Sequence, residues 1–199
     1  MSIGAAQIKE LREETGAGVL DCKKALEETG GDFEAAAKIL KEKGFAEAQK
    51  RADRETHNGI IELYNHGEGR VGVMVEVNCE TDFVARTNEF RTFAHELALQ
   101  IAANQPRYVS VEDVPEDIVE AEKDKFREDA IREGKPEQVI DRIVEGRMKK
   151  FYEDNCLLLQ TYIRDDTMTV ESLWKETIST IGENISIRRF IRWEMGEEV

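Results

Sequence analysis

The sequence is short of proline, cysteine and long apolar runs, and each shortage excludes a class of protein. It has three prolines among 199 residues and 40% hydrophobic side chains, the composition of a globular chain and not of a disordered one. No apolar run approaches the roughly 18 to 20 residues that a membrane span needs. The three cysteines, Cys22, Cys79 and Cys156, are widely spaced and odd in number, so we expect reduced thiols and no disulfide framework.

Positive charge is scarce as well. The chain has 28 Lys and Arg residues against 42 Asp and Glu residues, a formal net charge of −14. Nucleic acids and anionic membranes attract positive surfaces, so the sequence predicts neither kind of partner. A protein partner fits such a chain better. The opening segment MSIGAAQIKE lacks a basic region followed by an apolar one, so we expect a cytoplasmic location.

Hydrophobic spacing predicts a helical part at 1–55 and a mixed part at 56–199. Gly44 is predicted to end the last of three short helices in the first part, and 46–55 to form a polar, helix-prone connector. The apolar faces of these helices are expected to carry Ile8 and Leu11, then Cys22, Ala25 and Leu26, then Phe33, Ala36, Ala37 and Leu40.

The second part alternates between strand and helix patterns. The expected elements are strands at 59–64 and 70–78, a helix at 88–103, an antiparallel helical hairpin at 115–152, a strand or extended segment at 156–163, a helix at 170–181 and a strand at 185–195. The predicted fold class is therefore α+β, a three-helix module followed by a small antiparallel sheet packed with helices and a helical hairpin.

The stretch Glu76–Phe90, EVNCETDFVARTNEF, contains the corner between a predicted strand and a predicted helix. Functional residues are frequent at such corners, because a rigid scaffold presents them. At this corner Asp82 favours water or a cation, whereas Phe83 favours burial. One interpretation is that Phe83 is a core plug and that Asp82 or Thr81 is a helix N-cap. The other interpretation is that the corner is functional, and spacing alone does not decide between the two.

The residues most like a catalytic or metal site are His57, Cys79, Glu80 and Asp82. A hairpin turn at 66–69 would place His57 opposite Cys79, where a histidine, a thiol and a carboxylate could meet. Three scattered ligand types without CxxC or HExxH spacing are a weak motif. Polar residues that are satisfied at strand ends are the main interpretation and a catalytic or metal site is the alternative, so we expect no metal and no other cofactor.

Four separated stretches resemble the elongation factor Ts family, whose members exchange the nucleotide of the GTPase elongation factor Tu. Residues 76–86, EVNCETDFVAR, closely resemble the family's core signature, and 11–26 resemble its N-terminal signature. The runs at 134–147 and 182–189 agree with it, so the resemblance covers nearly the whole chain in order. It implies a ubiquitin-associated-like three-helix module, a core domain, and catalysis of GDP release in place of bond-making chemistry.

The resemblance also implies site residues. In the family, the aspartate and phenylalanine of the core signature act on the GTPase domain near its metal and phosphate site. The implied contacts are Thr81, Asp82, Phe83 and Val84 for Mg²⁺ dislocation and wedging, Arg12, Val19, Leu20 and Lys23 for the grip of the module, and Ile163 for another domain of the partner.

The family's long form has two core subdomains in tandem, whereas this chain has room for one. A twofold homodimer that supplies the second surface is therefore a further expectation, with the edge of the C-terminal strand, including Phe190, as the candidate for pairing. The alternative to an exchange factor is an ordinary interaction module, in which the three-helix unit binds some partner and the rest is scaffold. The two differ in whether the chain changes the release rate of a bound guanine nucleotide.

Overall fold

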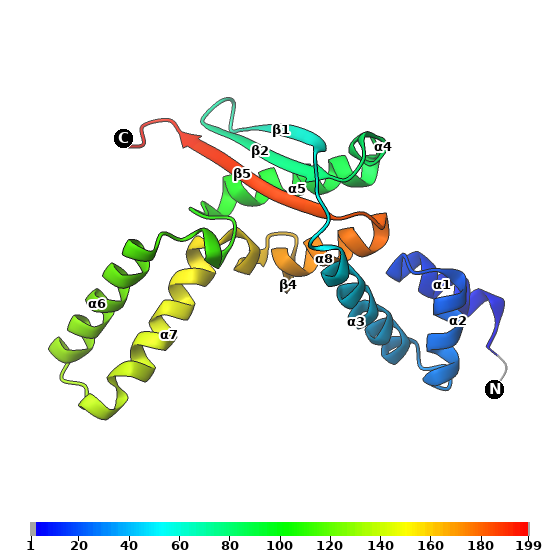
Figure 1. Cartoon of the computed structure of the whole chain (residues 1–199), viewed down its shortest axis with the longest axis horizontal. Coiled ribbons are helices and arrows are strands. Elements are labelled where there is room, and N and C mark those ends of the chain that lie inside the picture. Colours follow the sequence, from blue (N-terminus) through cyan, green and yellow to red (C-terminus); the bar gives the residue numbers. More distant parts are fainter. Residues whose placement is uncertain (1–2, 199) are drawn as a thin grey trace. The chain divides into compact units, whose positions relative to one another are not determined.

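The computed structural model describes residues 3–198 and confirms the predicted α+β class. The elements are α1 Ala5–Thr15, α2 Val19–Glu28, α3 Phe33–Arg51, β1 Asn58–His66, β2 Val71–Cys79, α4 Asp82–Ala85, α5 Asn88–Asn104, η1 Val111–Asp113, α6 Glu116–Arg132, α7 Glu137–Asn155, η2 Leu157–Leu159, β3 Thr161–Tyr162, β4 Asp165–Thr169, α8 Val170–Ile181 and β5 Ile185–Glu194 (Figure 1). None of the described helices is both long enough and apolar enough to cross a membrane.

Contacts divide the chain into two compact units. The first comprises residues up to 60 together with 77–94 and 172–186, and the second comprises 61–76, 95–171 and the residues from 187 onward. The three-helix module and the 81–84 corner therefore belong to the same unit, whereas Ile163 belongs to the other. The division into domains at residue 55 stays a prediction.

The three N-terminal helices pack on the faces that their spacing predicted. α1 ends at Gly16, which has a left-handed backbone with φ of 66°. Asp32 caps α3, because its side chain accepts a hydrogen bond from the amide nitrogen of Ala35 at 3.0 Å. The shared core of this module consists of Leu11, Cys22, Ala25, Leu26, Ala36 and Leu40.

The predicted helix stop at Gly44 is wrong, since α3 continues through it to Arg51. A Cβ atom added at Gly44 would lie 2.5 Å from the Oγ of Ser179 and 3.1 Å from its Cβ. Ser179 belongs to α8, so the missing side chain admits a close neighbour and does not mark a helix end. Much of the predicted connector is consequently the last part of α3.

The main sheet has three strands in the order β1-β2-β5. Along β2 the odd-numbered side chains from Val71 to Cys79 are buried, which shows that one face of the sheet is covered. Within the second unit α5 contacts this face: His95 pairs with Glu62 of β1 at 2.9 Å, and the Nε of Arg192 donates to the carbonyl oxygen of Ala102 at 3.3 Å.

The opposite face of the sheet, here called the outer sheet face, is apolar and exposed. The side chains of β5 alternate between the two faces, and those of Ile191 and Trp193 are exposed. The large apolar side chains of the outer sheet face are Ile61 and Leu63 of β1, Met74 of β2, and Ile191 and Trp193 of β5.

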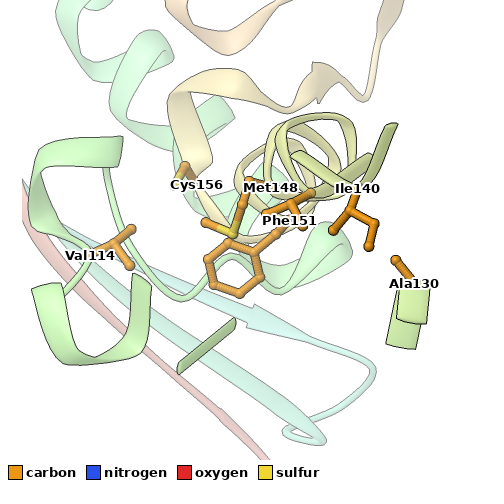
Figure 2. Packing of buried hydrophobic residues seen from close by; sticks show 7 residues of the cluster. Val114, Ala130, Ile140, Met148, Phe151 and Cys156 are labelled. Carbon is orange, nitrogen blue, oxygen red and sulfur yellow. The ribbon is translucent and has the colours of Figure 1, made fainter. Parts of the chain in front are cut away.

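The predicted helical hairpin is formed by α6 and α7, which lie side by side in Figure 1. Two ion pairs join the helices, Arg127 to Asp141 at 2.9 Å and Arg147 to Glu133 at 2.8 Å. Their common core, much of which is drawn in Figure 2, consists of Val114, Ala130, Ile140, Val144, Met148, Phe151 and Cys156.

A small two-stranded antiparallel sheet follows this hairpin. Strand β3 is only two residues long, because Leu157–Leu159 of the predicted 156–163 strand form a 3₁₀ turn instead. It pairs with β4, with Thr161 opposite Thr169 and Tyr162 opposite Asp165. We call residues 161–169 the tongue; Ile163 lies at its tip.

Candidate functional site

The corner at 81–84 is a single helical turn that projects its aromatic side chain into solvent. Thr81 is the N-cap of α4, since its hydroxyl accepts a hydrogen bond from the amide nitrogen of Val84 at 3.4 Å. Ala85 is buried, and Phe83, two positions earlier on the other side of the turn, is 79% exposed. The N-cap prediction is confirmed for Thr81, and the interpretation of Phe83 as a core plug is wrong.

The corner is anchored by a carboxylate that the sequence analysis did not assign to the site. The amide nitrogen and the hydroxyl of Thr81 donate to the two carboxylate oxygens of Glu183, at 3.1 and 2.7 Å. The preceding residue, Glu80, is also bound, because its carbonyl oxygen accepts from Nδ2 of Asn58 at 2.8 Å. Glu183 lies in the family-like run at 182–189, which was the only signal that could have pointed to it.

Asp82 presents a carboxylate that is held by a surface ion pair. Its Oδ2 is 2.8 Å from the guanidinium of Arg86, and both side chains are at least half exposed. Ion pairs of this kind contribute roughly 0 to 1 kcal/mol, because water screens them and ordering two side chains costs entropy. The carboxylate can therefore be transferred to another cation at little cost.

The residues considered for catalysis or metal binding each have a different neighbour. His57 contacts the carboxylate of Glu55 at 2.9 Å, whereas the thiol of Cys79 donates to the carbonyl oxygen of Thr81 at 3.1 Å. Burial, followed by the negative charge of Glu183, raises the pKa of Cys79 to about 11, so the thiol is protonated at neutral pH. Within residues 3–198 no group of His, Cys, Asp and Glu side chains is placed to hold a metal ion.

The predicted contact residues of the three-helix module are exposed on α1 and α2. Val19 and Leu20 form the first turn of α2, and Leu20 is 73% exposed. Arg12 and Lys23 are exposed too, and Lys23 is 3.7 Å from Glu27 along the same helix. An apolar pair open to solvent, with the cationic Lys23 one helical turn after Val19, is a surface suited to a protein partner.

Ile163 is held at the tip of the tongue by a buried amide. The side chain of Gln100 is fully buried, and its Oε1 accepts from the amide nitrogen of Ile163 at 2.9 Å. Its Nε2 donates to Oε1 of Gln160 and to the carbonyl oxygen of Thr161, both at 3.1 Å. The Ile163 side chain itself is 40% exposed, so the backbone is fixed while the apolar group stays available.

The residues on both sides of Ile163 are held by one carboxylate. The hydroxyl of Tyr162 and the Nε of Arg164 donate to Oε2 of Glu96, at 2.7 and 2.6 Å. Burial by itself would raise the pKa of Glu96, but the bonds from Arg164 and Tyr162 outweigh it and keep that pKa below its usual value. The tongue is thus a rigid support for a half-exposed apolar residue.

Comparison with known proteins identifies the family. The family model described as elongation factor TS matches residues 23–197. Elongation factor Ts of Coprothermobacter proteolyticus is 57% identical over 197 residues, which cover 99% of this chain and 100% of that protein. Elongation factor Ts of Caldanaerobacter subterraneus is 58% identical over 99% of this chain and 98% of that protein. The protein of the same name from Moorella thermoacetica is 52% identical over 99% of this chain. The chain therefore belongs to the elongation factor Ts family.

Proposed function

We propose that this protein is the guanine nucleotide exchange factor of elongation factor Tu, acting in the cytoplasm. It binds the GTPase loaded with GDP, speeds the release of GDP and so allows GTP to bind, without making or breaking a covalent bond. One observation carries the proposal: Phe83, in the family's core signature, is 79% exposed on a corner whose backbone is tightly anchored. A large apolar group kept in water on a rigid support is a binding element.

The physical task of an exchange factor is differential binding. A GTPase holds GDP and Mg²⁺ chiefly through phosphate and metal contacts. A ligand with equal affinity for the loaded and the empty GTPase would shift nothing, so the factor has to bind the empty form more tightly. The contacts that matter are those that compete with the metal and the phosphates.

Phe83 and Asp82 supply two such contacts. Phe83 enters an apolar gap of the GTPase domain, and burial of its ring contributes roughly 1.5 to 3 kcal/mol. Asp82 exchanges the weak pair with Arg86 for the neighbourhood of the Mg²⁺ ion, where a carboxylate disturbs the coordination of the metal or the phosphate-binding loop. Thr81 and Val84 complete the turn that aims both side chains.

The other exposed residues hold the partner. Val19 and Leu20, flanked by Arg12 and Lys23, grip the same GTPase domain. Ile163 contacts a further domain of the partner from the tip of the tongue. Each of the three apolar side chains loses solvent-exposed area on binding, which strengthens the complex without favouring either nucleotide state.

The test is the release of a fluorescent GDP analogue from elongation factor Tu. Wild-type protein should accelerate release, and Phe83→Ala should lose most of this acceleration. Ile131→Ala is the matched control, because Ile131 is a large exposed apolar residue on α6 outside the proposed contacts. An ordinary interaction module would bind the GTPase and leave the release rate unchanged, which would refute the proposal.

A second copy of this chain is the proposed occupant of the outer sheet face. Two molecules with a net charge of −14 repel each other, so they have to meet on a surface with little net charge. The outer sheet face is apolar, and Glu76 beside it is neutralised by Arg189 at 2.8 Å and Arg188 at 3.6 Å. A twofold axis would bring the same apolar side chains of two copies together.

This dimer differs from the strand pairing expected at the sequence level. β5 is an edge strand, yet its large apolar side chains lie on the face of the sheet, which favours face-to-face packing. Light scattering at micromolar concentration should give about twice the chain mass of 22.7 kDa. Trp193→Glu, at a residue that is 72% exposed, should give the monomer mass and keep the helix and strand content of the wild-type protein. A wild-type mass of one chain would rule out the dimer.

A further inference from the structure

Asn184 is a buried polar residue that forms hydrogen bonds to two other segments of the first unit. It is 4% exposed, and its Nδ2 donates to the carbonyl oxygens of Ala52 at 3.2 Å and Arg54 at 2.7 Å. Its amide nitrogen donates to Oε1 of Glu80 at 2.6 Å. Both protons of one side-chain amide and the adjacent main-chain proton therefore bind separate parts of the chain.

These parts lead to the two proposed contact regions. Ala52 directly follows α3, the last helix of the three-helix module, and Arg54 lies two residues further on. Glu80 directly precedes Thr81, the N-cap of the Phe83 corner. The guanidinium of Arg54 also lies 3.3 Å from Oε1 of Glu80, so the same two segments touch directly. We call this set of bonds around Asn184 the junction.

The bonds of the junction are of the kind that fix geometry. A buried amide has to have its donors satisfied, and both donors here find main-chain carbonyl oxygens. Among uncharged side chains, only asparagine and glutamine offer two donors on one planar amide nitrogen, and the shorter asparagine holds its target with fewer free torsions. The end of α3 is thus held at a set distance from Glu80.

We propose that Asn184 is a positioning residue that holds the three-helix module at a fixed position relative to the Phe83 corner. Binding of the GTPase through Leu20 then places Phe83 at its own binding site. The inference rests on the proposed exchange function. When two contacts belong to one rigid body, formation of the first raises the effective concentration of the second. Loosening the junction lowers that effective concentration while leaving each contact surface intact.

The experiment compares Asn184→Asp with wild type in binding and in exchange. Aspartate keeps the size and the main-chain amide but removes both side-chain donors. Binding to GDP-loaded elongation factor Tu should change by less than about threefold, because the grip is retained. GDP release at saturating concentration should fall about tenfold or more, because Phe83 is no longer delivered. In the Phe83→Ala background, Asn184→Asp should lower release no further.

Asn155→Ala is the matched control. Asn155 also donates from its side chain to a main-chain carbonyl oxygen, that of Phe151 at 2.8 Å, but it ends α7 in the other unit. It should lose stability and keep exchange, which separates a positioning effect from a loss of folded protein. All rates are compared well below the melting temperature of each variant.

Each outcome decides a different claim. If Phe83→Ala loses exchange while Asn184→Asp keeps the wild-type rate, the junction proposal is wrong and the exchange function stands. If Phe83→Ala keeps the wild-type rate, the proposed function itself fails. Should Asn184→Asp not fold, Asn184→Ala removes both side-chain donors without adding a charge, and an unchanged release rate there overturns the proposal.

Discussion

Thr81 and Glu183, 102 residues apart in the sequence, are joined by two hydrogen bonds from one residue to one carboxylate, at 3.1 and 2.7 Å. The first bond uses the amide nitrogen of Thr81 and the second uses its hydroxyl. Because Thr81 is also the cap of α4, these bonds set the direction in which the exposed Phe83 ring points. The Phe83 corner is therefore built from a local turn and a remote anchor.

The anchor predicts a difference between two substitutions of one residue. Glu183→Ala removes the acceptor of both bonds and should lower GDP release severalfold and the free energy of unfolding by roughly 1 to 3 kcal/mol. Glu183→Gln should keep most of both, since its amide oxygen can accept from the Thr81 nitrogen and its amide can donate to the Thr81 hydroxyl. Exchange rates and thermal melts of both variants check this. Equal behaviour of Ala and Gln would contradict it.

Because Phe83 is exposed, we predict that Phe83→Ala hardly changes the free energy of unfolding. A buried phenylalanine changed to alanine costs roughly 3 to 5 kcal/mol, whereas surface substitutions usually stay within about 0.5 kcal/mol. We expect the smaller value for Phe83→Ala, together with the loss of exchange proposed above. Denaturant unfolding measures it. A loss of several kcal/mol would show that the ring is buried in solution.

Two helical glycines should respond in opposite ways to the same change. A Cβ at Gly146 of α7 meets nothing within 4 Å, so Gly146→Ala should stabilise the protein by up to about 1 kcal/mol through helix propensity. A Cβ at Gly44 would lie 2.5 Å from Ser179 Oγ and 3.1 Å from Ser179 Cβ, so Gly44→Ala should lower the melting temperature. Calorimetric melting of the two variants side by side decides this. Equal gains would mean that Ser179 does not pack closely on Gly44.

The Cys79 thiol predicts a loss of stability at high pH. Burial, and then the charge of Glu183, raises its pKa from 9.0 to about 11 in the folded protein. Between these values the unfolded chain releases a proton that the folded chain keeps, so stability is complete below about pH 9 and falls toward pH 11. Cys79→Ser should reduce the fall in melting temperature over this range. The remaining slope includes Cys156, whose pKa burial also raises to about 11. An unchanged slope in Cys79→Ser would contradict the assignment.

The regular elements could be predicted from spacing, because their cause is local. The apolar periods around Leu11, Cys22 and Leu40 predicted the buried faces of the three N-terminal helices, and the alternation from Val71 predicted β2. Glycine was harder to interpret, because the same residue serves as a helix end at Gly16 and as a point of close contact at Gly44.

The site was only partly predictable. Periodicity cannot assign a buried face to a helix of one turn, so it could not decide whether Phe83 is a core residue or a partner contact. Only the family signature favoured a partner contact. Glu183 and Asn184 could not be assigned from spacing, since their partners Thr81 and Ala52 lie more than a hundred residues away. The Gln100 clamp on Ile163 also escaped prediction, because spacing does not report a contact between residues 63 positions apart.

The central claim is that this protein opposes an occupied nucleotide site, and its most direct test is the affinity for elongation factor Tu without nucleotide, with GDP–Mg²⁺ and with GTP–Mg²⁺. By linkage, a factor that lowers the affinity of the GTPase for GDP is itself weakened by GDP to the same extent. We predict the tightest complex without nucleotide and a loss of affinity with either nucleotide, at or above the roughly 1 to 3 kcal/mol typical of coupled sites. Asp82→Ala should reduce the GDP effect and keep much of the grip. Equal affinity in all three conditions would contradict the assignment of an exchange factor.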